Sequence, residues 1–369
     1  MGSYRVKSAQ AYREPSILIA REGVSVSEWN RVVEESSNGL PFHLYEWLEV
    51  LSETQRLTLK RYGLYTGPSF QQLVGVMPLL VGKLGPFRVA GSPFVVEDTP
   101  YMGPVIAEHL MPDALKAVQA TVNGEKAMFL RVLLPYMPSA DACRNLTEFE
   151  FTCGVKHTHI LNLSKGVPAL WNNMEGRCRT AVRRAEKSGV EIVRVDSMSE
   201  NRSEIESYYR LVEDVYGRQG RKPPNPPEFY HRLWEKLHAQ DMLSLLMARV
   251  NGSDIAGVLL AHYKNRVYYL DGASDRTFAK LCPTNLLLWK AIEWAASEGY
   301  SEFDFVGSDI PRLADFKASF GGEIAEYLCL EWARSKSIGL FRNWYGRYGK
   351  TMIEQLRILL GKLREASRV

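Results

Sequence analysis

Lys317 stands at a position where a lysine could take part in chemistry. It follows Phe316 in the stretch DFKASFGGE, a short helix-like segment between two strand-like segments. When an amine attacks an ester or thioester, negative charge builds up on the carbonyl oxygen, and a fixed cation near that oxygen lowers the barrier. A lysine can fill this role, or it can neutralise a phosphate of a bound donor. The residue pattern also allows a third interpretation, a solvated lysine on a helix surface.

Basic residues recur on one face of the segment 167–188, which its apolar stripe predicts to be a helix. They are Arg179, Arg183 and Lys187 at four-residue steps, with Arg177 and Arg184 beside them. Like charges at this spacing repel each other. The row therefore indicates either an ordinary solvated face or a surface that binds the phosphates of a tRNA or a nucleotide. Arg218, in VYGRQG, would make a bidentate phosphate contact of a kind that lysine makes poorly.

The elements that must position these residues occur in a similar order in both halves of the chain. The first half is predicted to hold helices at 25–37, 44–52 and 113–123 and strands at 57–65, 71–82 and 128–134. The second half is predicted to hold helices at 167–188, 200–219 and 227–239, followed by strands and one more helix. We therefore predict an α/β fold of two tandem domains, each a mixed sheet flanked by helices.

The second half predicts a place for a ligand. Asn251-Gly252 between two apolar runs predicts a hairpin, and NRVYYLDGAS predicts the next strand. A helix from an N-cap at Thr284 to Gly299 then leads to the strand SEFDFVG, and a helical crossover of this kind implies parallel pairing. Neighbouring parallel strands can splay at their carboxyl ends and admit a ligand there. This geometry would bring Tyr268, Tyr269, Asp271, Asp304 and the Phe316-Lys317 pair together, with the two tyrosines on opposite faces of their strand.

Composition limits the classes of function. The chain has 369 residues, 46% of them hydrophobic and 24% charged, and a net charge of +4, which fits a soluble protein of two domains. Its apolar runs fall short of the ~20 residues that a membrane-spanning helix needs, and the N-terminus does not have the pattern of a signal peptide. Five scattered cysteines favour reduced thiols in the cytoplasm. His157 and His159 alternate on an apparent strand and are more typical of surface or core than of a metal site.

Several segments resemble the Fem-type peptidyltransferases, which belong to the GNAT-like acyltransferase superfamily. They are RVYYLDGAS, NLLLWKAIEWAASEGYSEFDFVGS and DFKASFGGE in the second half, the basic segment 171–192, and PFHLYEWLEVL in the first half. The resemblance implies two tandem GNAT-like domains, at 1–154 and 155–335, with the main substrate site in the second. Two features depart from the family pattern: no long heptad-patterned insert occurs between 171 and 330, and the segment 336–369 has no counterpart.

The resemblance also implies roles for individual residues. The family's Phe-Lys pair falls on Phe316 and Lys317, which makes Lys317 the candidate catalytic residue. Its substrate-binding tyrosine falls on Tyr268, or on Tyr269 if the register differs by one residue. Its arginine before the hairpin falls on Arg218, with Arg221 as the alternative. With Arg177 and Arg183 from the basic helix, these residues form the predicted substrate site, and no resident cofactor or metal is expected.

Three functions remain open. The first is transfer of an aminoacyl group from a charged tRNA to an amine of a nucleotide- or lipid-linked peptidoglycan precursor. The second is acyl-CoA-dependent N-acylation in exopolysaccharide or other envelope biosynthesis. Against it stands RTFAKLCPTN, which has no glycine where the pyrophosphate of CoA usually meets a helix N-terminus. The third is a non-catalytic module that binds a lipid-linked glycan. We expect a cytoplasmic monomer.

The segment 336–369 predicts a basic amphipathic helix. It holds eight Lys or Arg residues and two Glu residues, a net charge of +6, and its apolar residues from Ile353 to Leu363 form one helical stripe. Such a helix either packs on the second domain or lies on anionic lipid, where each basic residue near the surface contributes roughly 1 kcal/mol. In the second case the protein would sit at the inner face of the plasma membrane.

Overall fold

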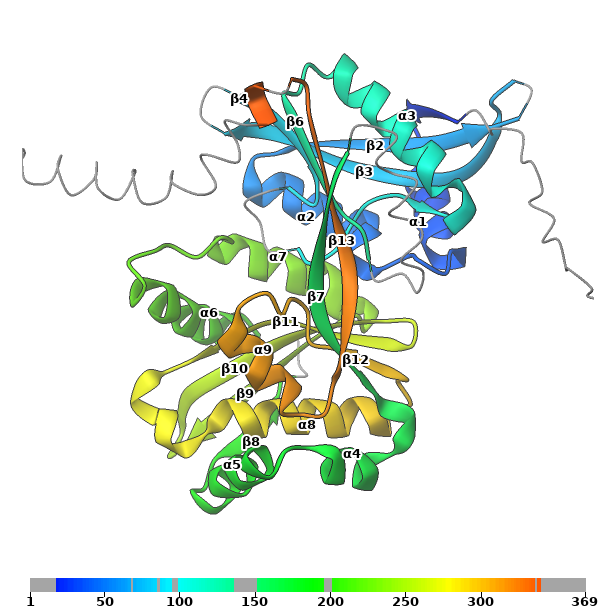
Figure 1. Ribbon diagram of the computed structural model, residues 1–369. Coiled ribbons are helices and arrows are strands. Elements are labelled where there is room, and N and C mark those ends of the chain that lie inside the picture. The colour runs from blue at the N-terminus through cyan, green and yellow to red at the C-terminus, as the bar shows by residue number, and fades with distance from the viewer. Residues whose placement is uncertain are drawn as a thin grey trace, which may run out of the picture.

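The computed structural model describes residues 18–67, 69–84, 87–94, 99–135, 151–195, 201–335 and 337–339 (Figure 1). The elements of the first half are β1 (Ile19–Glu22), α1 (Val26–Glu35), α2 (Tyr45–Gln55), β2 (Thr58–Thr66), β3 (Gln72–Leu84), β4 (Phe87–Ser92), β5 (Val105–Ile106), α3 (Met111–Gly124) and β6 (Phe129–Leu133). The chain then continues with β7 (Thr152–Asn162), α4 (Val167–Asn173), α5 (Gly176–Lys187), β8 (Glu191–Arg194), α6 (Asn201–Gly217) and α7 (Pro227–Leu237). The last elements are β9 (Leu243–Val250), β10 (Ser253–Tyr263), β11 (Arg266–Ser274), α8 (Pro283–Ser297), β12 (Glu302–Asp304), α9 (Pro311–Ala318) and β13 (Glu323–Ala333).

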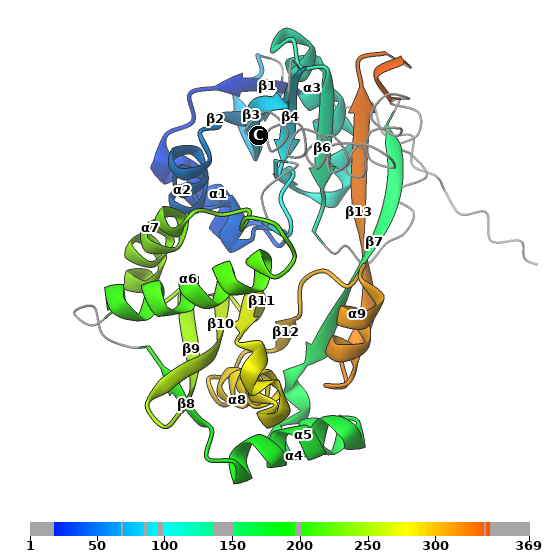
Figure 2. The same ribbon diagram turned by 90° about the vertical axis from the view of Figure 1, so that its left-hand side faces the viewer.

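One mixed sheet runs through both halves. Its strand order is β1-β2-β3-β4-β6-β13-β7-β12-β11-β10-β9-β8, with β5 paired to β3. The two long strands β7 and β13 cross from one half to the other (Figures 1 and 2). The end of β13, from Cys329 to Ala333, pairs with β6, so the last described strand of the chain completes the sheet of the first half. The predicted boundary between residues 154 and 155 falls within β7.

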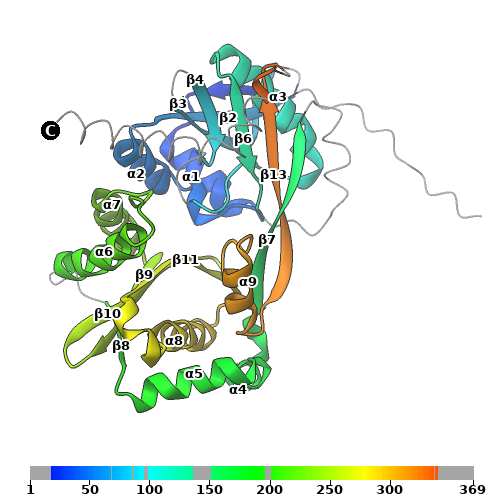
Figure 3. The same cartoon turned by 60° about the vertical axis from the view of Figure 1, so that its left-hand side comes forward.

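Helices cover the sheet on both faces and divide the apolar core into three clusters. The central cluster lies between the halves, where α1 and α2 of the first half meet α6 and α7 of the second (Figure 3). Its largest side chains include Trp29, Phe42, Trp47 and Tyr208. The second cluster lies under α3, and the third under α5 and α8. The two halves thus share a buried apolar core as well as two strands.

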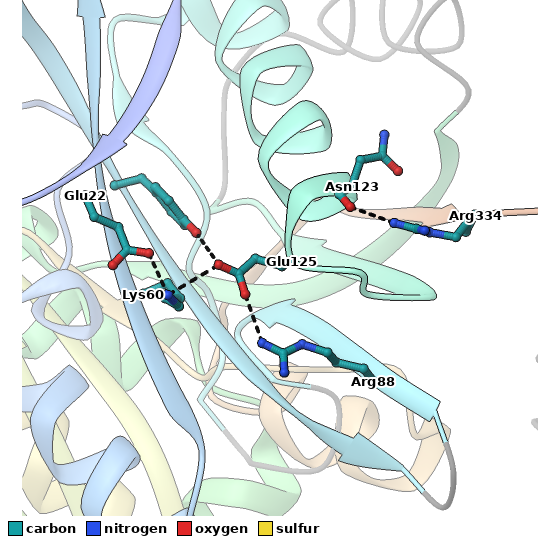
Figure 4. A network of polar contacts seen from close by, with 7 residues as sticks. Glu22, Lys60, Arg88, Asn123, Glu125 and Arg334 are labelled. Atoms are coloured by element: carbon teal, nitrogen blue, oxygen red, sulfur yellow. Dashed lines mark hydrogen bonds and ion pairs between the residues drawn. The ribbon is translucent and has the colours of Figure 1, made fainter.

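Polar contacts hold the end of β13 to the first half. Arg334, directly after β13, donates to the carbonyl oxygen of Asn123 in the last turn of α3 at 2.7 Å (Figure 4). It also donates to the carbonyl oxygen of Ala127, between α3 and β6, at 3.2 Å. Beside this contact Glu125 accepts from Arg88 at 2.9 Å and lies 3.3 Å from Lys60 (Figure 4). Cations at a helix C-terminus are favourable because the unpaired carbonyls there carry partial negative charge.

The structure confirms the predicted mixed sheet and corrects two details of the helices. The segment 167–188 is two helices, because Met174 and Glu175 have extended backbones with ψ of 149° and 145°. The break allows the guanidinium of Arg179 to donate to carbonyls at the end of α4, among them that of Asn172 at 3.0 Å. Helix α8 begins at Pro283 after a left-handed Cys282, so Thr284 is not its N-cap. Proline suits the first helical position because its missing N–H would have no partner there.

Gly299 has a φ of 86° just after α8, as predicted for a residue that ends a helix. The predicted basic helix at 336–369 lies outside the described residues except for 337–339. Among the residues that the structure describes, none of the helices combines the length and the apolar character needed to span a membrane.

Candidate active site

The strands β11 and β12 are parallel, as predicted, but they pair only over three residues. Arg266 to Tyr268 of β11 pair with Glu302 to Asp304 of β12. Beyond this point the chain after β12 stays with β7, since the backbone N–H of Phe305 donates to the carbonyl of His159 at 2.9 Å. Strand β11 instead continues to Ser274 along β10, with a bulge after Tyr269. The two parallel strands therefore part at their carboxyl ends.

Lys317 lies at this point and is buried. Only 7% of its surface is exposed, and its Nζ donates to the carbonyl oxygens of Val306 and Gly307. Both carbonyls belong to the turn after β12, where Val306 and Gly307 adopt left-handed φ values of 49° and 61°. The ammonium also lies 5.8 Å from the centre of the Tyr269 ring. The interpretation of Lys317 as a solvated surface lysine is therefore wrong.

Burial changes the acid strength of this lysine. Loss of solvent lowers the pKa of Lys317 to about 8, although the carboxylates of Asp304 and Asp309 favour the charged form. At pH 7 a group with such a pKa is still roughly 90% protonated. An ammonium has three N–H donors, of which the two carbonyls of the turn use two. The two carbonyls of the turn therefore leave one N–H of the Lys317 ammonium for a further acceptor.

Asp304, the last residue of β12, is fully buried beside the lysine. Its Oδ1 accepts hydrogen bonds from Thr158 Oγ1 at 2.7 Å, from the backbone N–H of Val306 at 2.8 Å and from the Tyr101 hydroxyl at 3.3 Å. Burial raises the pKa of Asp304, whereas these donors favour its charged form. The carboxylate thus fixes the turn whose carbonyls hold Lys317.

Strand β7 supplies further polar groups to the site. His159 is buried, its Nδ1 lies 2.8 Å from the Ser308 hydroxyl, and burial lowers its pKa. Sequence reasoning missed the contribution of Thr158 and His159, although their alternation with His157 on a strand was a usable signal. The described residues contain no group of three His, Cys, Asp or Glu side chains placed to hold a metal ion.

The structure brings some of the predicted site residues together and separates others. Phe316 packs on Phe320 with ring centres 5.5 Å apart, next to Lys317. Tyr269 faces Lys317, whereas Tyr268 points to the other face of β11 and packs against Phe42 of the first half, with ring centres 5.2 Å apart. The prediction that the two tyrosines face opposite ways is confirmed. Of the two, Tyr269 is the one beside Lys317.

Arg218 lies near the far end of β11. It forms an ion pair with Asp214 and donates to the carbonyl of Ser274 at 3.1 Å. Ser274 is five residues beyond Tyr269, which corresponds to about 16 Å along a strand. Asp214 also lines a groove of about 440 Å³ with Ser207, Arg210, Leu211, Gly252, Ser253, Asp254 and Asp275. Arg218 therefore lies in a second region of the surface. The part of β11 that extends beyond its pairing with β12 separates this region from Lys317.

The basic helix α5 lies on the other side of the site. Arg177 donates to the carbonyl of Asp315 in α9 at 3.4 Å and pairs with Glu175, so it touches the helix that carries Lys317. Arg183 is exposed and lies over the Trp171 ring at 5.3 Å. Helix α5 also packs against the short 3-10 helix at Arg276–Leu281. The exposed basic side chains of this surface are Arg177, Arg183, Arg184, Lys187, Arg276 and Lys280.

A comparison with protein families identifies the central part of this assembly. Residues 172–318, which include α5, β11, β12 and Lys317, match the family model of the acetyltransferase (GNAT) domain. This segment is therefore similar to GNAT-type acetyltransferase domains. The match begins in α4 and ends with α9, so it leaves out the first half and the two strands β7 and β13. A comparison with curated protein sequences gives no match.

Solved structures show that the GNAT-type fold extends over most of the chain. FemX is similar with a TM-score of 0.63 and 18% sequence identity, over 83% of this chain and 96% of FemX. The C-terminal domain of a putative lysylphosphatidylglycerol synthetase from Agrobacterium fabrum gives 0.54 and 13%, over 85% and 93%. A tandem GNAT protein from the clavulanic acid biosynthesis pathway gives 0.53 and 10%, over 86% and 98%. The predicted tandem GNAT-like, Fem-type architecture is confirmed at the level of the fold.

Proposed function

We propose that this acyltransferase forms an amide by moving an aminoacyl group from a charged tRNA to an amine of a cell-wall precursor. The observation that carries the proposal is Lys317, a buried ammonium with one N–H left over at the point where β11 and β12 part. The amine nitrogen attacks the ester carbonyl, a C–N bond forms, and the C–O bond to the ribose breaks. The amine loses a proton and the ribose oxygen gains one. Lys317 stabilises the negative charge on the carbonyl oxygen in between.

The charge distribution around the site supports an anionic donor of large size. The basic surface on α5 and the neighbouring 3-10 helix presents six cationic side chains, and Arg177 joins it to α9. The repulsion between neighbouring cations in this row decreases when phosphates bind along it. Arg179 does not belong to this surface, because its guanidinium is used at the end of α4. A tRNA end lying along α5 would bring its ester toward Lys317.

The acceptor would approach from the side of the site opposite α5. Arg218 and the groove beside Asp214 lie along the free part of β11. A nucleotide- or lipid-linked precursor carries a pyrophosphate that a guanidinium can contact in a bidentate manner. Because a donor tRNA is a cytoplasmic molecule, we place the reaction in the cytoplasm or at the inner face of the plasma membrane. The chain would act as a monomer.

An acyl-CoA donor is the second candidate, because the matching family model is that of an acetyltransferase domain. The start of α8 gives it little support. A pyrophosphate at a helix N-terminus needs free backbone N–H groups, yet Pro283 has none and the N–H of Asn285 donates to the carbonyl of Cys282 at 3.2 Å. A non-catalytic glycan-binding module fits the acyltransferase family match less well and would not need Lys317.

Single-turnover transfer with three donors tests the proposal. We would mix the protein with aminoacyl-tRNA, acetyl-CoA or no donor, each with a nucleotide-linked muropeptide, and follow amide formation by mass spectrometry. Transfer from aminoacyl-tRNA alone is the expected result. Transfer from acetyl-CoA alone would replace the first function by the second. Binding of the muropeptide by calorimetry without transfer from any donor would favour the binding module.

A further inference from the structure

Tyr101 of the first half reaches into the site of the second half. It is 1% exposed, and its hydroxyl donates to Asp304 Oδ1 at 3.3 Å across 203 positions of sequence. The two residues that follow it are anchored within the first half. The N–H of Met102 donates to the carbonyl of Leu133 at 2.8 Å, and the N–H of Gly103 donates to Ser92 Oγ at 2.9 Å. The hydroxyl of Tyr101 is therefore held at a fixed place relative to β6.

From Asp304 a short series of hydrogen bonds leads to Lys317. The same Oδ1 that accepts from Tyr101 accepts from the N–H of Val306 at 2.8 Å, and the carbonyl of Val306 accepts from Lys317 Nζ. Val306 is β-branched and has a φ of 49°, a backbone conformation that such residues rarely adopt without outside support. The carboxylate of Asp304 supplies part of that support. Tyr101 in turn fixes the carboxylate from the first half.

We propose that Tyr101 is a positioning residue for Lys317, so that the first half of the chain takes part in catalysis without contacting the reacting atoms. The inference rests on the proposed function of Lys317. Tyr101 does not touch the lysine. It fixes the Asp304 carboxylate, which fixes the turn at Val306 and Gly307, and that turn aims the ammonium between the parting strands.

Tyr101→Phe is a suitable perturbation because it removes one hydroxyl and keeps the ring. The ring packs against Tyr327 with centres 4.9 Å apart, and this contact is unchanged by the substitution. Tyr62→Phe is a matched control in the first half, since it removes a hydroxyl that donates to the carboxylate of Glu125 at 3.2 Å, far from the site. Both variants lose one hydrogen bond from a buried tyrosine to a carboxylate. They differ in which carboxylate is affected.

The first experiment compares turnover in the two variants. Tyr101→Phe should lower kcat roughly tenfold, the equivalent of one hydrogen bond, and leave the KM values for donor and acceptor unchanged. In a Lys317→Met background the same substitution should cause no further loss, because residues that act through one another are not additive. Tyr62→Phe should leave kcat unchanged. An undiminished kcat in Tyr101→Phe, or an additional tenfold loss in the Lys317→Met background, would overturn the proposal.

The second experiment does not depend on activity. The rate at which acetic anhydride labels Lys317, followed by mass spectrometry of its peptide, reports how firmly the turn holds the ammonium. Labelling should be several times faster in Tyr101→Phe than in wild type and unchanged in Tyr62→Phe. Equal rates in all three proteins would refute the positioning role. If wild type transfers no group from any donor, the proposed function fails, and the labelling rates still decide whether Tyr101 positions the lysine.

Discussion

Replacing Lys317 by methionine is the most informative single change in this protein. Methionine approximates the volume of the lysine stem and removes the ammonium, which donates to Val306 and Gly307 and has one further N–H. Loss of one electrostatic contact to a developing oxyanion commonly costs on the order of 2.7 to 4 kcal/mol of transition-state stabilisation. Turnover of Lys317→Met should therefore fall roughly 100- to 1000-fold.

The pH dependence separates a charge effect from a packing effect. Because the pKa of Lys317 is lowered to about 8, single-turnover rates of wild type should decline above pH 8 as the ammonium loses its proton. The residual rate of Lys317→Met should lack this decline. Lys165→Met is the control and should keep the wild-type rate and its pH dependence. Lys165 is exposed and lies 4.0 Å from Glu323. A wild-type rate in Lys317→Met, or the same alkaline decline in both proteins, would refute the catalytic role.

The pH dependence of the free energy of unfolding, compared between wild type and Lys317→Met, tests whether the charge of Lys317 is buried. In the folded protein the pKa is about 8, below the ordinary value of 10.5, so the unfolded chain binds more protons between these pH values. Folding stability contributed by this group therefore rises as the pH increases through that window. The free energy of unfolding of wild type should gain up to about 3 kcal/mol relative to Lys317→Met between pH 7 and pH 10.5. A constant difference in urea denaturation across that range would show that the lysine is solvated.

Three further predictions concern the surroundings of the site. Arg218→Lys keeps the charge but loses the planar fork, so the acceptor KM should rise with little change in kcat, as steady-state kinetics can show; an unchanged KM would remove Arg218 from the acceptor site. The double variant Arg184→Ala, Lys187→Ala should weaken the binding of tRNA. Filter binding at several salt concentrations should show that the slope of log affinity against log salt becomes smaller in magnitude by about 1 to 2. An unchanged slope would mean that α5 is an ordinary solvated face. Arg334→Met should lower the free energy of unfolding by about 1 kcal/mol with kcat unchanged, because the carbonyls of Asn123 and Ala127 lose their donor. Urea denaturation measures this change, and an unaltered urea midpoint would mean that the contact contributes nothing to holding β13.

The sequence allowed the order of elements in the second half to be predicted because the signals there are local. An Asn-Gly turn, a helix that ends at Gly299 and a helical crossover between two strands each depend on neighbouring residues. The parallel pairing of β11 with β12 follows from that crossover. The Phe316-Lys317 pair follows the second of these strands, but its role was implied by the resemblance to the Fem-type peptidyltransferases and not by local spacing.

The environment of Lys317 could not be predicted, because it depends on contacts between distant parts of the chain. The lysine is buried by the turn at Val306, and a left-handed conformation at a β-branched residue has no sequence signal. Tyr101 meets Asp304 across 203 positions, and no periodicity indicates such a pair. The break between α4 and α5 was also missed, because an apolar stripe continues through it. At the break the N–H of Glu175 donates to the distant carbonyl of Ser319 at 2.9 Å, a contact that local sequence does not indicate.

The candidate site is therefore a property of both halves and not of the GNAT-type segment alone. Residues 172–318 supply Lys317, Tyr269 and Asp304, but two of the three donors to Asp304 Oδ1 lie outside that segment, on Thr158 and Tyr101. Strand β7 carries Thr158 and is itself held by β13, whose far end completes the sheet of the first half. A change in the first half can thus reach the lysine through fixed hydrogen bonds. Through Tyr101 the first half would take part in the chemistry at Lys317, and the Tyr101→Phe variant tests this role.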